Sequence, residues 1–227
     1  MTKSVVITGT DTGIGKTFVS TLLLAGFNRL GWTSFGMKPI ASGRFKTNNG
    51  HCYHDDALQL QKHASLKRDY QLVNPILLEK PVSPNIAASV MNMELSTSFV
   101  KQTLVSSIQH EADINVIEGV GGWLVPINET ALFADIINEL AIPVILVVGI
   151  KLGCLNHSLL TYQHMLSKNT NLLGWIANCF PIDTLCIKEN ISTLQHWIKA
   201  PCLGIIPGNC DVLDERVVKR LIDLLYE

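Results

Sequence analysis

Hydrophobic residues along this chain follow two alternating patterns. Short, nearly continuous apolar runs rich in valine and isoleucine predict strands that are covered on both faces, as in parallel sheets. Longer segments between them space their apolar residues every three or four positions, which predicts helices. The predicted strands are Lys3–Thr8, Thr33–Lys38, Asp113–Glu118, Pro143–Gly149, Leu172–Asn178 and Cys202–Ile206. The predicted helices are Gly15–Leu30, Thr97–His110, Ala131–Leu140, Leu155–Lys168, Thr184–Ile198 and Val212–Leu225. This alternation predicts an α/β fold with a mostly parallel, doubly wound sheet and helices on both faces.

Two stretches interrupt the alternation. Ala41–His54 is polar and contains two glycines, so it predicts a long loop, and long loops are more often functional than idle. Pro75, Pro81 and Pro84 mark a second irregular region. No linker rich in proline, glycine or serine divides the 227 residues, so we expect a single domain over residues 1–227.

Composition narrows the possible functions. Lys and Arg number 18 and Asp and Glu 19, a net charge of −1, whereas nucleic-acid-binding proteins usually carry a basic excess. The longest strongly apolar stretch, Ala141–Ile150, is much shorter than the roughly 20 residues of a membrane-spanning helix, and no signal-peptide pattern follows the first residues. The six cysteines form no CxxC pair. We therefore expect a soluble, reduced, cytoplasmic protein with neither a nucleic-acid nor a membrane partner.

The segment Gly9–Thr17 (GTDTGIGKT) lies between the first predicted strand and the first predicted helix. Glycines there allow backbone N–H groups to point at phosphate oxygens, and the helix start adds partial positive charge. Lys16 would supply a point charge to the β- and γ-phosphates, and the Thr17 hydroxyl could bind Mg²⁺. Five residues separate Gly9 from the Gly-Lys pair, against four in the common pattern. No third glycine has the spacing of a dinucleotide site, so the segment predicts a P-loop NTPase-like fold.

Two charged residues end predicted strands, at the edge where open α/β sheets bind ligands. Glu118 precedes the turn Gly119–Gly122, and an acidic residue at the end of a buried strand beside a P-loop is typical of a Mg²⁺ ligand. Lys38 precedes Pro39–Gly43 and could stabilise an anionic substrate or a transferring phosphoryl group. An ordinary exposed glutamate and a surface lysine are the alternative interpretations.

The segment His51–Asp56 (HCYHDD) contains enough histidine, cysteine and aspartate to suggest a metal site. Its spacing matches no fixed transition-metal pattern, and Mg²⁺ prefers oxygen ligands. The segment could therefore be a transition-metal site, a polar loop, or the source of one aspartate ligand for Mg²⁺.

Several blocks in a fixed order resemble the dethiobiotin synthetase family over nearly the whole chain. The blocks are Thr8–Thr17 (TGTDTGIGKT), Lys38–Gly43 (KPIASG), Asn74–Pro75, Pro81–Pro84, Glu118–Trp123 (EGVGGW) followed by Pro126, Pro143–His157 (PVILVVGIKLGCLNH) and Gly174–Asn178 (GWIAN). The resemblance implies an ATP- and Mg²⁺-dependent ligase of biotin biosynthesis that forms C–N bonds. Its substrates would be 7,8-diaminononanoate, CO₂ and ATP, and the reaction would pass through a carbamate and a carbamic–phosphoric mixed anhydride. It also implies a homodimer with shared sites.

The resemblance assigns residues to each ligand. Lys16 and Lys38 would be catalytic and flank the carbamate and the γ-phosphate. Thr17, Asp56 and Glu118 would hold Mg²⁺. The substrate residues would be Thr12, Ser42, Ser83, Gly153 and Asn156. The ATP-binding residues would be Gly13, Ile14, Gly15, Lys16, Thr17, Phe18, Asp56, Glu118, Gly119, Val120, Gly121, Asn178, Cys179, Pro207, Gly208 and Asn209.

Two positions depart from the family pattern, and one other function stays open. Gly13 stands where many members carry an acidic residue, and Asn85 stands where histidine is frequent. The alternative is a P-loop partitioning or switch ATPase that acts on a protein or DNA partner. Such ATPases usually carry a second lysine in the phosphate loop, where this chain has Thr10–Thr12. An amidotransferase acting on a corrinoid precursor would need a glutaminase domain, for which 227 residues leave no room.

Overall fold

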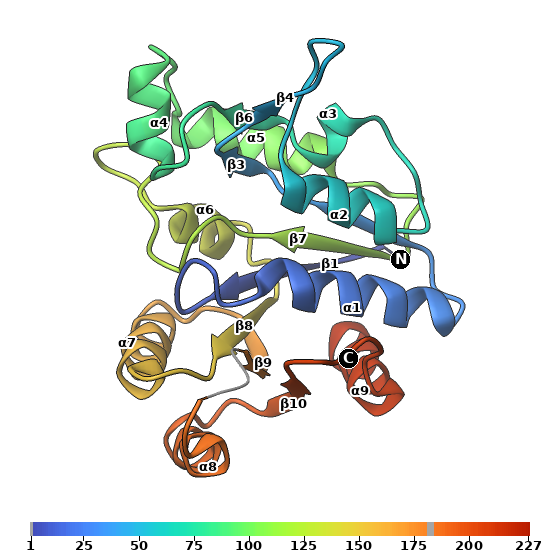
Figure 1. The fold of residues 1–227 in the computed structure, drawn as a ribbon, viewed down its shortest axis with the longest axis vertical. Helices are drawn as coiled ribbons and strands as arrows, with labels where there is room; N and C mark the ends of the chain where they lie inside the picture. The colour runs from blue at the N-terminus through green and yellow to red at the C-terminus, as the bar shows by residue number, and fades with distance from the viewer. Residues whose placement is uncertain (1, 181–183) are drawn as a thin grey trace.

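The computed structural model describes residues 2–180 and 184–227. Its main sheet has six strands in the order β10-β9-β8-β1-β7-β2, and all neighbouring strands are parallel (Figure 1). The strands are β1 (Lys3–Gly9), β2 (Ser34–Met37), β7 (Ile114–Glu118), β8 (Val144–Gly149), β9 (Leu172–Cys179) and β10 (Cys202–Pro207). Each overlaps one of the predicted apolar runs. The predicted α/β class with a mostly parallel sheet is therefore confirmed.

Helices cover both faces of this sheet. The helices are α1 (Lys16–Arg29), α2 (Asp55–His63), α3 (Tyr70–Val73), α4 (Pro84–Val90), α5 (Thr97–Ser107), α6 (Phe133–Glu139), α7 (Cys154–Ser167), α8 (Ile187–Trp197) and α9 (Glu215–Tyr226). Alternate residues of β1 face opposite sides: Val5 and Ile7 pack in a cluster with α1 and α9, and Val6 packs in a second cluster with α5, α6, α7 and α8. None of the helices in the described part of the chain is long and apolar enough to cross a membrane.

The register of the central strands brings two distant charged residues together. Ile7 of β1 lies opposite Glu118, the last residue of β7. Met37, the last residue of β2, lies opposite Ile117 of the same strand. Lys38 therefore leaves β2 beside Glu118, at the same edge of the sheet as the turn that follows β1.

The two stretches predicted as irregular contain short elements. β3 (Ile40–Ser42) pairs in parallel with β6 (Ile76–Leu78), and β4 (Phe45–Lys46) pairs antiparallel with β5 (Cys52–Tyr53). Strands of two or three residues contain too few positions for hydrophobic periodicity to identify them. The stretch Ala41–His54 is thus more ordered than the sequence predicts, and α2 begins directly after it.

Candidate functional site

A cavity of about 780 Å³ opens at the carboxyl ends of β1, β2 and β7. The turn after β1, the segment after β2, the starts of α2 and α4, and the glycine run after β7 form its wall. Ligands bind at this edge in open α/β sheets. The predicted site residues in the wall are Thr12, Gly13, Gly15, Lys16, Thr17, Phe18, Lys38, Ser42, Asp56, Ser83, Glu118, Val120 and Gly121.

Two glycines shape the turn between β1 and α1. Gly13 and Gly15 have φ angles of +71° and +89°, in the left-handed region that favours glycine. Gly15 precedes α1, so the helix begins at Lys16, one residue later than predicted. A Cβ atom on Gly15 would lie 2.2 Å from Nδ2 of Asn178, which donates a 2.8 Å hydrogen bond to the Ile14 carbonyl. Asn178, near the end of β9, therefore holds the turn against the sheet and leaves no room for a side chain at Gly15.

Lys16 is buried under this turn, with 7% of the residue exposed. Its Nζ donates a 2.9 Å hydrogen bond to the carbonyl of Asp11. Burial, assisted by the positive charge of Lys38, lowers the pKa of Lys16 to about 8. An anion placed against this ammonium group would favour its protonated form, because opposite charges stabilise each other in a buried setting.

Lys38 is also buried but lies between two carboxylates. Its Nζ is 2.5 Å from Oε1 of Glu118 and 2.7 Å from Oδ2 of Asp56. Burial disfavours the charged form of Lys38, but the two carboxylates outweigh it and raise the pKa of Lys38 above its usual value. Burial likewise disfavours the charge on Asp56, but Lys38 outweighs it and lowers the pKa of that carboxyl. Lys38 and Asp56 are therefore both charged at neutral pH.

The oxygen atoms near Lys38 form a set that suits Mg²⁺. The Thr17 hydroxyl donates a 2.9 Å hydrogen bond to Oε1 of Glu118. The other carboxylate oxygen, Oε2, is buried and has no hydrogen-bond partner among the described residues. A buried, unpaired carboxylate oxygen is stabilised by a cation, and Mg²⁺ prefers such hard oxygen ligands. The predicted ligands fit the ion, and Asp56 rather than its exposed neighbour Asp55 lines the cavity.

The transition-metal alternative for His51–Asp56 finds no support in the geometry. Across residues 2–180 and 184–227, no group of three or more His, Cys, Asp or Glu side chains is arranged to hold a metal ion. His51 is exposed, and the ring of His54 is hydrogen-bonded within the cavity wall. The segment instead contributes Asp56 to the site.

Three predicted substrate residues, Thr12, Ser42 and Ser83, line the same cavity. The hydroxyl of Ser42 is buried and has no hydrogen-bond partner within the described part of the chain. Val82 and Pro84 add apolar surface to the wall. This side of the cavity therefore combines polar groups with a surface that can contact methylene groups.

Other predicted site residues lie outside the cavity wall. Gly153 and Asn156 lie at the start of α7, with Gly153 as its cap at a φ of +91°. Cys179 and Pro207 lie opposite each other at the ends of β9 and β10. The remaining residues outside the wall are Ile14, Gly119, Asn178, Gly208 and Asn209. The structure thus gathers both lysines and both acidic residues in one cavity and leaves the α7 residues apart from it.

Six residues of the wall were not predicted as site residues: His54, Pro81, Val82, Pro84, Gly122 and Val125. His54 had a usable signal, since it directly precedes two acidic residues and a helical pattern, as capping residues do. Gly122 belongs to a glycine run that the sequence did single out. Nothing in the sequence marks Val125, which reaches the wall only because the chain folds back after that run.

Comparisons with known proteins show which family this chain is similar to. A family model for an AAA domain matches residues 3–216. The ATP-dependent dethiobiotin synthetase BioD of Cellvibrio japonicus (strain Ueda107) is 42% identical over 205 residues, which cover 90% of this chain and 89% of that protein. The ATP-dependent dethiobiotin synthetase BioD 1 of Escherichia coli (strain K12) is 41% identical over 224 residues, which cover 99% of both chains.

Solved structures show a shared fold at much lower identity. The MinC:MinD cell division protein complex of Aquifex aeolicus matches with a TM-score of 0.55 and 16% identity, over 99% of this chain and 94% of that one. Cobyrinic acid a,c-diamide synthase of Mycobacterium smegmatis matches with a TM-score of 0.51 and 13% identity, over 99% and 93%. These likenesses define the P-loop NTPase-like fold alone. Identity near 40% over nearly the full length of both chains goes further: the chain belongs to the ATP-dependent dethiobiotin synthetase family.

Proposed function

We propose that this chain forms dethiobiotin from 7,8-diaminononanoate, CO₂ and ATP. The observation that carries the proposal is the pair of buried lysines in one cavity: Lys16 lies under a phosphate-binding turn, and Lys38 lies beside Glu118 and Asp56. Phosphoryl transfer requires mainly positioning and neutralisation of charge, and both are available here. The names of the relatives include ATP and dethiobiotin, and the family resemblance implies the diamine and CO₂ as the other substrates.

The reaction proposed has three balanced steps. One amine of the substrate adds to CO₂ and loses a proton, which gives a carbamate. A carbamate oxygen then attacks the γ-phosphorus of ATP; the bond to the β,γ-bridging oxygen breaks, ADP leaves, and a carbamic–phosphoric anhydride forms. The second amine attacks the carbonyl carbon of this anhydride and loses a proton. Phosphate leaves, and the ureido ring is closed.

In this scheme the two lysines act on different charges. Lys16 neutralises the β- and γ-phosphates, which its place under the turn after β1 supports. Lys38 stabilises the carbamate and the transferring phosphoryl group. The buried Ser42 hydroxyl, with Thr12 and Ser83, would contact the diamine or its carbamate.

Nucleotide and metal have their own residues in the proposal. The Asn178 Oδ1 is buried and has no hydrogen-bond partner in the described part of the chain, so it could accept a hydrogen from the adenine amino group. Cys179 and the segment 207–209 lie at the adjoining strand ends. Thr17, Asp56 and Glu118 would hold Mg²⁺, which when bound neutralises charge on the phosphate oxygens.

We also propose a homodimer in which the neighbouring subunit completes the site. Gly153 and Asn156 lie outside the cavity, whereas the family resemblance gives them to the substrate carboxylate. Leu152 beside them is fully exposed in the single chain, so a neighbouring subunit has room to contact this loop. A mixture of Lys38→Ala and Asn156→Trp subunits tests this. Shared sites predict recovery of activity that neither variant has alone, and exchange of subunits without recovery would contradict them.

A cytoplasmic location is proposed from the cysteines. All six are free thiols in the structure, and disulfides form mainly in oxidising compartments.

A product assay tests the proposed reaction. The protein is incubated with ATP, Mg²⁺, the diamine and ¹³C-bicarbonate. The products are then separated, and their masses are measured by mass spectrometry. We expect dethiobiotin with the ¹³C label in its ureido carbonyl, and none when ATP is omitted. Absence of the labelled ring from a folded, nucleotide-binding protein would contradict the proposal. The switch-ATPase alternative has only the shared fold in its favour, at 16% identity.

A further inference from the structure

His54 joins two parts of the cavity wall that are distant in sequence. It directly precedes α2, and its side chain is 17% exposed. Its Nδ1 lies 3.2 Å from the backbone nitrogen of Asp56, and its Nε2 lies 3.2 Å from the carbonyl oxygen of Ser42. One imidazole ring therefore reaches from the end of β3 to the first turn of α2.

These two contacts give the two ring nitrogens of His54 different hydrogen-bonding roles. The backbone N–H of Asp56 is a donor, so Nδ1 of His54 must accept. The carbonyl of Ser42 is an acceptor, so Nε2 must donate. As a cap, Nδ1 also pairs one of the N–H groups that a helix leaves unpaired at its start.

The backbone of His54 is tied to the site by a second route. Its N–H donates a 2.8 Å hydrogen bond to the Tyr70 hydroxyl, which donates a 3.1 Å hydrogen bond to Oδ1 of Asn74. Nδ2 of Asn74 then donates a 2.7 Å hydrogen bond to the carbonyl of Lys38. Lys38 and Asp56 are thus connected by two routes. Their side chains form an ion pair, and the hydrogen bonds through Asn74 and Tyr70 join the Lys38 carbonyl to the backbone N–H of His54, two positions before Asp56.

We propose that His54 is a positioning residue for the magnesium site, an inference that rests on the function proposed above. Its imidazole acts through Asp56: it holds the first turn of α2 at a constant distance from the segment after β2. The Asp56 carboxylate then stays beside Lys38 and Glu118, where the predicted metal binds. Replacing a residue that orients a metal ligand without contacting the metal typically lowers the metal affinity by roughly 10–100-fold.

The test uses Mn²⁺ as a spectroscopic probe in place of Mg²⁺. Binding of Mn²⁺ to the full-length protein with ADP is measured by electron paramagnetic resonance for the wild type, His54→Ala and His54→Asn. Asparagine is a strong capping residue and can accept the Asp56 N–H through its side-chain oxygen. We expect His54→Ala to weaken Mn²⁺ binding roughly tenfold and His54→Asn to recover most of that loss.

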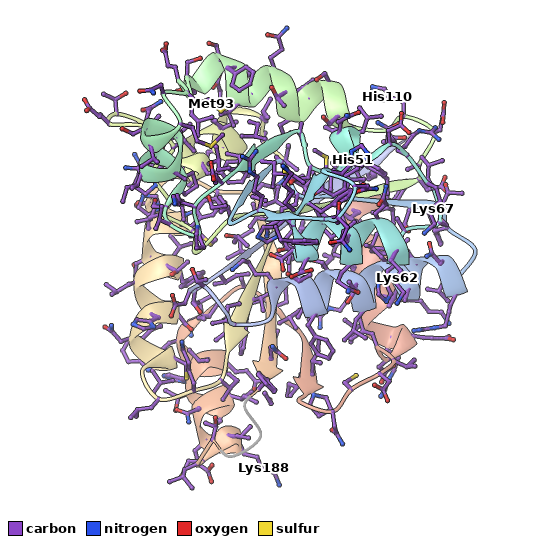
Figure 2. All side chains as sticks on the ribbon, turned by 45° about the horizontal axis from the view of Figure 1, so that its top comes forward. His51, Lys62, Lys67, Met93, His110 and Lys188 are labelled. Atoms are coloured by element: carbon purple, nitrogen blue, oxygen red, sulfur yellow. The ribbon has the colours of Figure 1, made fainter. Side chains whose placement is uncertain are left out.

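His51→Ala is the matched control. His51 lies in the exposed turn before β5, only a few positions from His54, and is labelled in Figure 2. Its side chain does not line the cavity, so its loss should leave Mn²⁺ binding unchanged. Thermal unfolding of all variants separates a loss of folding from a loss of metal affinity. If His54→Ala does not fold, the Mn²⁺ affinities of the wild type and of His54→Asn are compared with that of His51→Ala.

The outcomes separate this inference from the proposed reaction. Mn²⁺ binding by His54→Ala at the level of His51→Ala would overturn the inference, and so would a His54→Asn variant as weak as a folded His54→Ala. In the same samples, a wild-type protein that binds Mn²⁺ and ADP but makes no labelled dethiobiotin would contradict the proposed function alone. The steady-state Mg²⁺ requirement should rise in His54→Ala by the same factor as the Mn²⁺ dissociation constant.

Discussion

The side of the cavity proposed to bind nucleotide and the side proposed to bind substrate, called here the nucleotide side and the substrate side, are built in different ways. Within the cavity wall, the nucleotide side is one continuous segment from the turn after β1 into the start of α1, and the φ angles of Gly13 and Gly15 determine its shape. The substrate side is assembled from Lys38 just after β2, Ser42 at the end of β3, and Asp56 in α2, and Asp56 meets Lys38 only in the folded chain. Backbone geometry defines the nucleotide side, and contacts between side chains define the substrate side.

The two lysines show the same difference in their electrostatics. Burial lowers the pKa of Lys16 to about 8, so this side of the cavity is short of negative charge and suits an anionic ligand. Lys38 already has Glu118 and Asp56 beside it, and its pKa is raised. The charge of Lys16 on the nucleotide side is thus balanced only when an anionic ligand binds. The charge of Lys38 on the substrate side is already balanced by the protein before any ligand binds.

Replacement of Lys38 should have the largest effect, and this effect should be on the rate of reaction and not on nucleotide binding. Lys38→Met removes the charge that we propose stabilises the transferring phosphoryl group, so kcat should fall by roughly 10²–10³-fold. Binding of ADP should change by less than about threefold, because the turn after β1 is unaltered. Steady-state kinetics and calorimetric titration with ADP measure the two quantities. An equal loss of ADP affinity would mean that the two sides are not separate.

A pair of neighbouring aspartates sharpens the assignment of the metal. Asp56→Asn removes a charge next to Lys38, and we expect the Mg²⁺ concentration for half-maximal activity to rise by roughly 10-fold or more. Asp55→Asn is the matched control: Asp55 starts the same helix but is exposed, so its loss should have little effect. A larger effect from Asp55 would mean that the wrong carboxylate has been placed at the metal.

This contrast also decides what could be predicted from the sequence. The turn at Gly9–Thr17 was predictable because its glycines, its lysine and its position between a strand and a helix are local features. Lys38 and Glu118 could be placed at strand ends, because parallel strands end at one edge of the sheet. Their 2.5 Å ion pair could not be predicted, since it depends on the β2–β7 register.

The substrate side was predicted least well from the residues themselves. Ser42 and Ser83 were assigned by resemblance alone, and the β3–β6 pairing that supports this wall joins residues more than thirty positions apart. The role of His54 in the wall depends on a ring that reaches Ser42 across a short hairpin. Periodicity reports local burial and carries no information on such contacts.

The pKa of Lys16 predicts how nucleotide binding responds to pH. Below about pH 8 the free protein already carries the ammonium group that phosphate requires, and above it a proton must be taken up on binding. The affinity for ADP should therefore be constant at lower pH and fall roughly tenfold for each further pH unit, since one pKa unit corresponds to about 1.36 kcal/mol. Calorimetric titrations between pH 7 and 9 measure this, and an affinity independent of pH in that range would contradict the lowered pKa.

Asn178 should give the smallest effect, and on the nucleotide side only. Asn178→Ala removes the 2.8 Å hydrogen bond to the Ile14 carbonyl and the proposed acceptor for the adenine amino group. We expect the KM for ATP to rise by roughly 3–10-fold with kcat little changed, the usual consequence of losing one hydrogen bond. Inosine triphosphate, which lacks that amino group, serves as the comparison substrate. The variant should lose the preference for ATP, and an unchanged preference would place the adenine elsewhere.

The central claim is that the two sides act on one reaction, so phosphate transfer requires the substrate side to be filled. Release of phosphate from ATP in the presence of Mg²⁺ and bicarbonate tests it most directly, measured with and without 7,8-diaminononanoate. We predict that release is slow without the diamine, rises strongly with it, and yields one phosphate for each dethiobiotin formed. Phosphate release at the same rate with and without the diamine would contradict the account and indicate an ATPase that acts on a different partner.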